Sequence, residues 1–147
     1  MQRIADVMTR DVTSVAPQES LRHAAEMMDE LNVGALPVCD GERLVGMITD
    51  RDITVRATAA GEMPENTRVE EVMTDQVRWC FDNQSVEDVM KQMGDTQIRR
   101  MPVVEHDTQK LIGIISLGDL ATKHSAEVDR TLEEISTPAK PDRSSLH

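Results

Sequence analysis

The sequence contains almost no aromatic residues: one Trp, one Phe and no Tyr among 147 residues. Basic residues are also scarce, because 16 Lys and Arg face 27 Asp and Glu, which gives a formal net charge of −11. Proteins bind duplex nucleic acids through a basic surface, and they usually stack single strands on several aromatic side chains. The composition therefore argues against nucleic acid of either kind as a partner.

Cysteines are scarce, and long apolar runs are missing as well. The two cysteines, Cys39 and Cys80, are too few for a disulfide framework. No apolar run reaches the roughly 20 residues that a membrane helix needs, and the N-terminal MQRIADVMTR lacks the apolar core of a signal peptide. We therefore expect a soluble, cytoplasmic protein that makes no use of a membrane, with a core of Val, Ile, Leu, Ala and Met.

The sequence also contains an internal repeat. Val7-Met8-Thr9 returns 65 residues later as Val72-Met73-Thr74, and a two-residue insertion then lengthens the spacing to 67. The insertion falls in a predicted turn, where extra length costs little. We predict two copies of one unit, residues 1–62 and 63–124, followed by a tail, 125–147. The other identical pairs are Val12/Val77, Ser20/Ser85, Met28/Met93, Pro37/Pro102, Val38/Val103, Leu44/Leu111, Gly46/Gly113, Ile48/Ile115 and Asp52/Asp119.

Each copy predicts the same α/β (α+β) pattern, β-α-β-β-α, after a short opening helix. Ser20 and Ser85 are placed to cap the first long helix, because a serine before an amphipathic stripe is typical of a helix start. Asp40-Gly41 fits a hairpin turn between two apolar strands. Sheets this small are not stable alone, so we expect the copies to pack together. The predicted elements of copy one are helix Ile4–Met8, strand Val12–Val15, a helix from Leu21, strands Ala35–Cys39 and Leu44–Thr49, and a helix from Asp50; the hairpin strands of copy two are Ile98–Val104 and Lys110–Ser116, with a helix from Leu117.

The tail does not belong to the repeat. Ser125 is placed to cap a helix over residues 125–136, with Val128, Leu132 and Ile135 on one face. The residues after this stretch are polar and include prolines, which predicts disorder. A helix with one apolar face needs a surface to cover it, so the tail is a candidate contact for a partner.

A duplicated hydroxyl–carboxylate motif is the best candidate for chemistry. Gly46-Met47-Ile48-Thr49-Asp50-Arg51-Asp52 and Gly113-Ile114-Ile115-Ser116-Leu117-Gly118-Asp119 each place a hydroxyl, and three residues later an acid, where a strand meets a helix. A helix N-terminus offers free N–H groups to a phosphate, and a carboxylate one turn later can accept from a ribose diol. The same residues also fit an ordinary helix cap with an acidic first turn.

Taken in order, these motifs resemble the cystathionine-β-synthase (CBS) domain, and two copies in one chain resemble a Bateman module. The resemblance covers residues 3–124, through Met-Thr, Leu-Pro-Val or Met-Pro-Val, and Gly-x-Ile-[Ser/Thr]-x-x-Asp. It implies a pseudo-twofold pair of domains, with small mixed sheets covered by helices, two ligand clefts and often a flat homodimer. It also implies an adenine nucleotide as regulatory ligand, with AMP as the leading candidate and ADP, ATP, NAD or S-adenosylmethionine as alternatives.

The resemblance also assigns roles to individual residues. It implies a phosphate contact for Thr49 and Ser116, a ribose contact for Asp52 and Asp119, and an apolar base contact for Met47 and Ile114. Basic side chains before the Pro often hold phosphate in this family, and here the copies diverge: Arg99-Arg100-Met101-Pro102 against Gly34-Ala35-Leu36-Pro37. We expect the cleft that Arg99 and Arg100 reach to prefer the more phosphorylated ligand, although both could instead face solvent or pair with acids. Arg51 is a weaker phosphate candidate, and we expect it to form a surface ion pair instead.

The remaining reactive residues indicate no catalysis and no metal. The four histidines have no metal-ligand spacing, and no Ser/His/Asp or paired-acid arrangement is visible. We therefore expect a regulatory, non-enzymatic module that senses an adenine nucleotide and passes the signal to an unknown downstream protein. The alternative is a structural dimerisation or protein-interaction module that binds no nucleotide.

Overall fold

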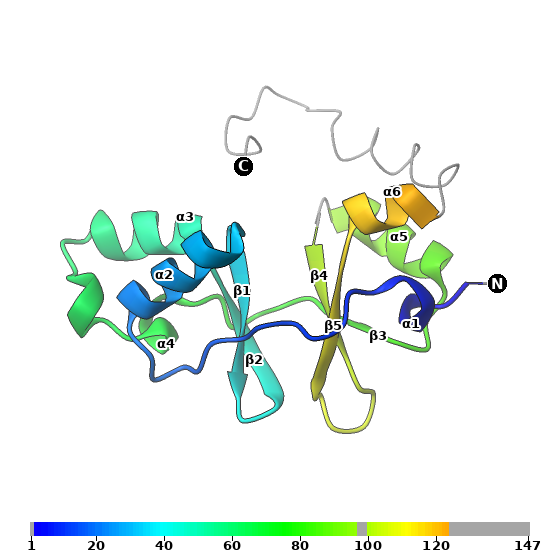
Figure 1. The fold of residues 1–147 in the computed structure, drawn as a ribbon, viewed down its shortest axis with the longest axis horizontal. Coiled ribbons are helices and arrows are strands. Elements are labelled where there is room, and N and C mark those ends of the chain that lie inside the picture. Colours follow the sequence, from blue (N-terminus) through cyan, green and yellow to red (C-terminus); the bar gives the residue numbers. More distant parts are fainter. Residues whose placement is uncertain (1, 97–99, 124–147) are drawn as a thin grey trace. The chain divides into compact units, whose positions relative to one another are not determined.

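The computed structural model describes residues 2–96 and 100–123, which form two compact units. The early unit comprises Thr13–Val77 and Gln109–Leu111. The late unit comprises the described residues of Met1–Val12, Arg78–Thr108 and Ile112–His147. Each unit therefore combines residues from distant parts of the chain (Figure 1). Within the described ranges, no helix is both long enough and apolar enough to cross a membrane.

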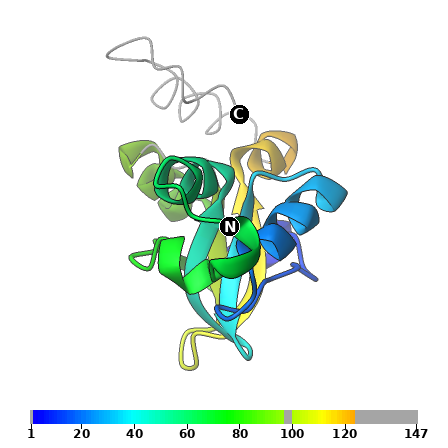
Figure 2. The same cartoon turned by 90° about the vertical axis from the view of Figure 1, so that its left-hand side faces the viewer.

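The early unit is a β-hairpin covered by helices (Figure 2). Its long helix begins where the Ser20 hydroxyl accepts the His23 N–H at 3.1 Å, as predicted. The hairpin pairs Ala35 with Thr49 at its open end, and Gly41 turns it with a φ of +65°. Its elements are α2 (Leu21–Leu31), β1 (Ala35–Asp40), β2 (Arg43–Thr49), α3 (Asp50–Asp52), the π-helix η1 (Ile53–Thr58), the 3-10 helix η2 (Pro64–Asn66) and α4 (Val69–Val72).

The late unit repeats this plan with a third strand. Its sheet has the order β3-β4-β5, and β3 runs parallel to β4. Ser85 accepts the Asp88 N–H at 3.1 Å where the long helix begins, as predicted. The hairpin strands and the helix after them also confirm the predicted order. Its elements are α1 (Ile4–Val7), β3 (Cys80–Phe81), α5 (Val86–Thr96), β4 (Arg100–Val104), β5 (Leu111–Ser116) and α6 (Leu117–Lys123).

The opening segment of each sequence copy belongs to the unit of the other copy. Helix α1 starts the chain, yet Ile4 and Val7 are buried in the core of the late unit. Helix α4 precedes copy two, yet Val69 and Val72 are buried in the core of the early unit. The predicted repeats, 1–62 and 63–124, thus mark duplicated sequence, whereas the compact units follow a different division.

A close backbone approach holds each exchanged segment in place. Thr74 and Met47 exchange both backbone hydrogen bonds, at 2.8 and 2.9 Å, and Thr9 and Ile114 do the same at 2.9 and 3.0 Å. The residue before Met47 is Gly46, where a Cβ would lie 2.8 Å from the Thr74 carbonyl oxygen and 2.7 Å from the Met73 sulfur. The repeated Met-Thr and Gly are therefore partners across the exchange.

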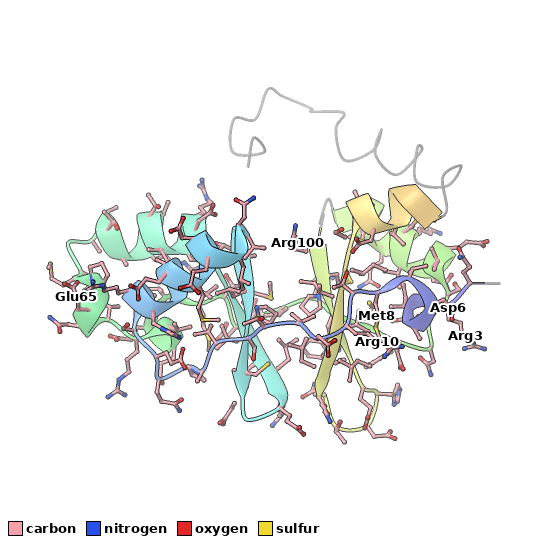
Figure 3. The ribbon with its side chains drawn as sticks, viewed as in Figure 1. Arg3, Asp6, Met8, Arg10, Glu65 and Arg100 are labelled. Atoms are coloured by element: carbon pink, nitrogen blue, oxygen red, sulfur yellow. The ribbon has the colours of Figure 1, made fainter. Side chains whose placement is uncertain are left out.

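The late unit has the same arrangement around its glycine. A Cβ on Gly113 would lie 3.0 Å from the carbonyl oxygen of Thr9 and 2.6 Å from the Met8 sulfur. Met8 is labelled in Figure 3 beside the first helix of the chain. The duplication has therefore preserved a packing contact as well as a sequence motif.

One predicted strand is absent from the described residues, and other predicted elements lie outside them. The predicted strand Val12–Val15 is wrong as a strand: Val15 forms only an isolated parallel bridge with Val38, since the chain around it makes no further ladder pairs. The mixed α+β fold is confirmed. The predicted tail, including its helix over 125–136, lies outside the described residues, and so do Ile98 and Arg99.

The glycine contact can be tested by adding one methyl group. We expect Gly46→Ala to lower the free energy of unfolding by about 1–3 kcal/mol, because the methyl group would press against a backbone carbonyl that cannot move freely. The measurement is urea-induced unfolding. Gly118→Ala is the matched control, since its nearest atom would lie 3.6 Å away. Equal stability of the two variants would contradict this account of the exchange.

The cysteines give a second test of the packing. Cys80 is fully buried, and burial, with a smaller effect of the Asp82 carboxylate, raises its pKa to about 12. Burial also raises the pKa of Cys39. Because the thiolate is the nucleophile, we expect both thiols to resist iodoacetamide in the native protein and to react readily in urea. Labelling that is as fast in the native protein as in urea would show that these strands open easily.

Candidate functional site

The hydroxyl–carboxylate motif of the early unit lies where β2 meets α3. Thr49 is the N-cap of α3, and its hydroxyl oxygen accepts the Asp52 N–H at 3.0 Å. The Asp52 carboxylate in turn accepts the Thr49 N–H at 3.1 Å. Each residue therefore satisfies a backbone group of the other, as in a capping box. This pairing fixes the orientation of both side chains before any ligand arrives.

The Asp52 side chain is held from a second side. Only 12% of it is exposed, and the Arg56 Nε lies 3.8 Å from its other carboxylate oxygen. The same guanidinium donates to the carbonyl oxygens of Val72 and Met73, each at 3.2 Å. Arg56 therefore joins the candidate ribose-binding carboxylate to the exchanged segment.

The first turn of α3 leaves few free backbone donors. Besides the two N–H groups in the capping box, the Asp50 N–H donates to the Gly34 carbonyl at 2.9 Å. The Arg51 N–H donates to the Asp50 carboxylate at 2.8 Å. Thus the N–H groups of residues 49–52 all have partners within the protein. The chain's own acceptors therefore hold the backbone donors at this helix N-terminus.

The late unit places the equivalent motif where β5 meets α6. The Ser116 hydroxyl oxygen accepts the Asp119 N–H at 3.1 Å. The Thr9 hydroxyl, from the exchanged segment, lies 3.4 Å from the Asp119 carboxylate and donates to it. Both carboxylates are therefore linked to an exchanged segment, by Arg56 in one unit and by Thr9 in the other.

The predicted base-contacting residues occupy matching positions. Met47 and Ile114 are both half-buried, each two residues before the hydroxyl of its motif. Each is also the residue that bridges to the exchanged segment, at Thr74 and Thr9 respectively. The structure thus brings the hydroxyl, the acid and the apolar residue of each motif together within one unit.

The candidate arginines lie less close to these groups. Arg100 is exposed and is the first residue of β4, at the end of the sheet where β5 leads into α6 (Figure 3). Arg99 lies outside the described residues. Arg51 is exposed, and its guanidinium forms no ion pair with any residue in the described part of the chain. The expected surface pair of Arg51 is therefore not seen there.

Sequence reasoning did not assign three residues that the structure connects to the motifs: Thr9, Asp50 and Arg56. The signal for Thr9 was present, since Met-Thr recurs in the repeat as Met8-Thr9 and Met73-Thr74. Arg56 follows Asp52 by four residues, a spacing that brings side chains together on a helix. Asp50 gave no signal, because its copy-two equivalent is Leu117.

The two histidines that the structure describes, His23 and His106, both lie outside the two motifs. His23 pairs with Glu19 at 3.1 Å, and His106 packs against Phe81 with ring centroids 4.6 Å apart. Among residues 2–96 and 100–123, no group of three or more His, Cys, Asp or Glu is arranged to hold a metal ion.

Comparison with known proteins identifies the family of this chain. A sequence model of the CBS domain matches residues 4–57 and 69–125. CBS domain-containing protein YhcV of Bacillus subtilis is 44% identical over 121 residues, which cover 82% of this chain and 84% of YhcV. Hypoxic response protein 1 of Mycobacterium tuberculosis is 39% identical over 123 residues, which cover 82% of this chain and 84% of that protein.

Solved structures share the fold. Hypoxic response protein I, with two coordinated zinc ions, superposes with a TM-score of 0.75 at 36% identity, over 83% of this chain and 98% of that one. The CBS domain pair of protein MJ0100, in complex with 5′-methylthioadenosine and S-adenosyl-L-methionine, superposes with a TM-score of 0.70 at 27% identity, over 82% of this chain and 98% of that one. Two matches to one domain model, and relatives that match over most of their length, place this chain in the CBS domain family, with two copies of the domain.

Proposed function

We propose that this chain is a regulatory module that binds adenosine-type ligands at its two hydroxyl–carboxylate motifs. One observation carries the proposal: both units hold a hydroxyl, a carboxylate and an apolar side chain in the same arrangement. A cap is needed at each helix for packing alone, but an aspartate three residues after the hydroxyl and a half-buried apolar residue two before it are not needed in both units. The MJ0100 pair, solved with two adenosine ligands, supports this ligand class.

Each group retains the chemistry that a nucleoside needs. The Thr49 oxygen accepts one hydrogen bond, and its own proton donates to no other residue in the described part of the chain. A carboxylate has about four acceptor sites, so Asp52 and Asp119 can keep their present partners and still accept from a ribose diol. Met47 and Ile114 offer an apolar surface to the base. We assign AMP as the leading ligand, with ADP, ATP, NAD and S-adenosylmethionine as alternatives.

The proposed output is a change in conformation or in partner affinity. A ligand shifts such an equilibrium only by its differential affinity for the two states. In both units the candidate carboxylate touches an exchanged segment, through Arg56 or through Thr9. A ligand that binds this carboxylate would therefore lie next to the exchanged segment of that unit. We propose a cytoplasmic homodimer that signals to another protein and catalyses no reaction itself.

A second function is favoured by a specific observation. Thr49 and Asp52 already satisfy each other's backbone groups, and the Ser116 hydroxyl accepts the Asp119 N–H. A module that serves only to dimerise or to bind a protein would keep these residues as helix caps. It would bind no nucleotide and would melt at the same temperature with or without one.

A ligand panel separates the two functions. We expect at least one of AMP, ADP, ATP, NAD and S-adenosylmethionine to stabilise the protein, by about 2.7 kcal/mol at a concentration 100 times its Kd. The measurement is a thermal-shift assay followed by calorimetric titration. No stabilisation by any of them at millimolar concentration would favour the structural module.

Single variants then locate the binding. We expect Asp52→Asn and Asp119→Asn each to weaken binding at one motif about tenfold, since a charged acceptor for the diol becomes a neutral one. Asp6→Asn is the matched control, because Asp6 also accepts the N–H of its own N-cap residue, Arg3, but lies outside both motifs. Losses of equal size in all three variants would point to a general effect on folding.

A further inference from the structure

The two motifs are chemically different at the residue after the hydroxyl. In the early unit this residue is Asp50, which is exposed, and in the late unit it is Leu117, which is buried. We propose that Asp50 excludes phosphate from the early motif, so that this motif takes an adenosine whose 5′ position is uncharged or cationic. The late motif then takes the 5′-phosphorylated nucleotide. This division rests on the function proposed above.

The backbone donors of the early motif are already used. A phosphate at a helix N-terminus needs N–H groups that point at it. Here the N–H groups of residues 49–52 bind the Asp52 carboxylate, the Gly34 carbonyl, the Asp50 carboxylate and the Thr49 hydroxyl. Two of these four acceptors are negatively charged. Carboxylates of the chain itself thus take the place that a phosphate would occupy at these N–H groups.

A glycine leaves room for the Asp50 carboxylate. A Cβ on Gly34 would lie 3.0 Å from one Asp50 carboxylate oxygen and 3.6 Å from the other. Gly34 has no side chain, so the carboxylate lies over its backbone and holds the Arg51 N–H. Gly34 is also the copy-one equivalent of Arg99. At these two positions the sequence of copy one has Gly34 and Asp50, whereas the sequence of copy two has Arg99 and Leu117.

The late motif has no equivalent acid. Leu117 has an apolar side chain, so it cannot accept the Gly118 N–H as Asp50 accepts the Arg51 N–H. Arg100, at the same end of the sheet as Ser116, adds a positive charge on this side of the unit. Because local charges outweigh distant, screened ones, these differences decide which motif tolerates a phosphate.

Two ligands test the division on the full-length chain: AMP, which carries a 5′-phosphate, and 5′-methylthioadenosine, which carries an uncharged thioether. Asp119→Asn leaves the early motif as the stronger site, and Asp52→Asn leaves the late one. By calorimetric titration, we expect the Asp119→Asn protein to bind 5′-methylthioadenosine at least tenfold more tightly than AMP. We expect the Asp52→Asn protein to show the opposite order.

The decisive variant adds Asp50→Asn to the Asp119→Asn chain. Asparagine keeps an acceptor for the Arg51 N–H and loses only the charge. We expect the affinity for AMP to rise about tenfold, and the affinity for 5′-methylthioadenosine to change less than twofold. Glu65→Gln is the control, since it removes one charge from an exposed residue on the 3-10 helix, away from the motif (Figure 3). Asp50→Ser provides a second neutral variant with an acceptor, should Asp50→Asn fold poorly.

The results of these titrations distinguish a failure of this inference from a failure of the proposed function. A rise in AMP affinity with Asp50→Asn but not with Glu65→Gln supports the exclusion of phosphate. Unchanged AMP affinity, in a protein that still binds 5′-methylthioadenosine, overturns the role of Asp50 and leaves the proposed function standing. If neither ligand binds to the unmodified chain, both the proposed function and this inference are overturned.

Discussion

The fold depends on the contact between a glycine in a strand and a Met-Thr pair from another part of the chain. Gly46 meets Met73 and Thr74, and Gly113 meets the equivalent pair in the other unit. Two backbone hydrogen bonds between Met47 and Thr74 join the two segments, and Gly46 allows this close approach because it has no Cβ. Neither sequence copy completes its own unit, because each unit takes its opening helix from the other copy's sequence. Two half-sized repeats become interdependent in this way, with no aromatic core.

The same contact fixes the positions of the candidate ligand groups. Each glycine precedes the apolar residue of its motif. The hydroxyl residue ends the strand, and the acid lies in the first turn of the helix that follows. The exchanged segment also reaches the carboxylates, since Thr9 donates to Asp119, and Arg56 bridges Asp52 to the carbonyls of Val72 and Met73. If either carboxylate changes its hydrogen-bond partners, the exchanged segment is therefore the first part of the chain to be affected. This is a physical route for coupling, since sites communicate through contiguous packed and hydrogen-bonded contacts.

The sequence was sufficient to predict the repeat, the caps and the hairpins, because each depends on residues close together in the chain. Ser20 and Gly41 carry local signals, and the structure confirms both the cap and the turn. The exchange could not be predicted, because a short helix such as Ile4–Val7 has the same pattern whichever core it enters. The strand expected at Val12–Val15 failed for a related reason: alternating apolar residues indicate burial, but the partner that would extend the ladder is set by tertiary packing. The sequence does not single out Asp50, because this residue differs between the copies, whereas a repeat identifies only the residues that the copies share.

Capping and ligand binding are compatible roles for the same side chains. The cap of α3 uses one lone pair of the Thr49 hydroxyl and one oxygen of the Asp52 carboxylate. It leaves the hydroxyl proton and the other carboxylate oxygen, and Arg56 Nε approaches that oxygen only to 3.8 Å. A site held by its own cap loses little conformational entropy when a ligand arrives, and preorganisation of this kind raises affinity. The capping geometry by itself favours a purely structural role. It would equally serve a small nucleoside site, because the cap holds the side chains in place where no large core does so.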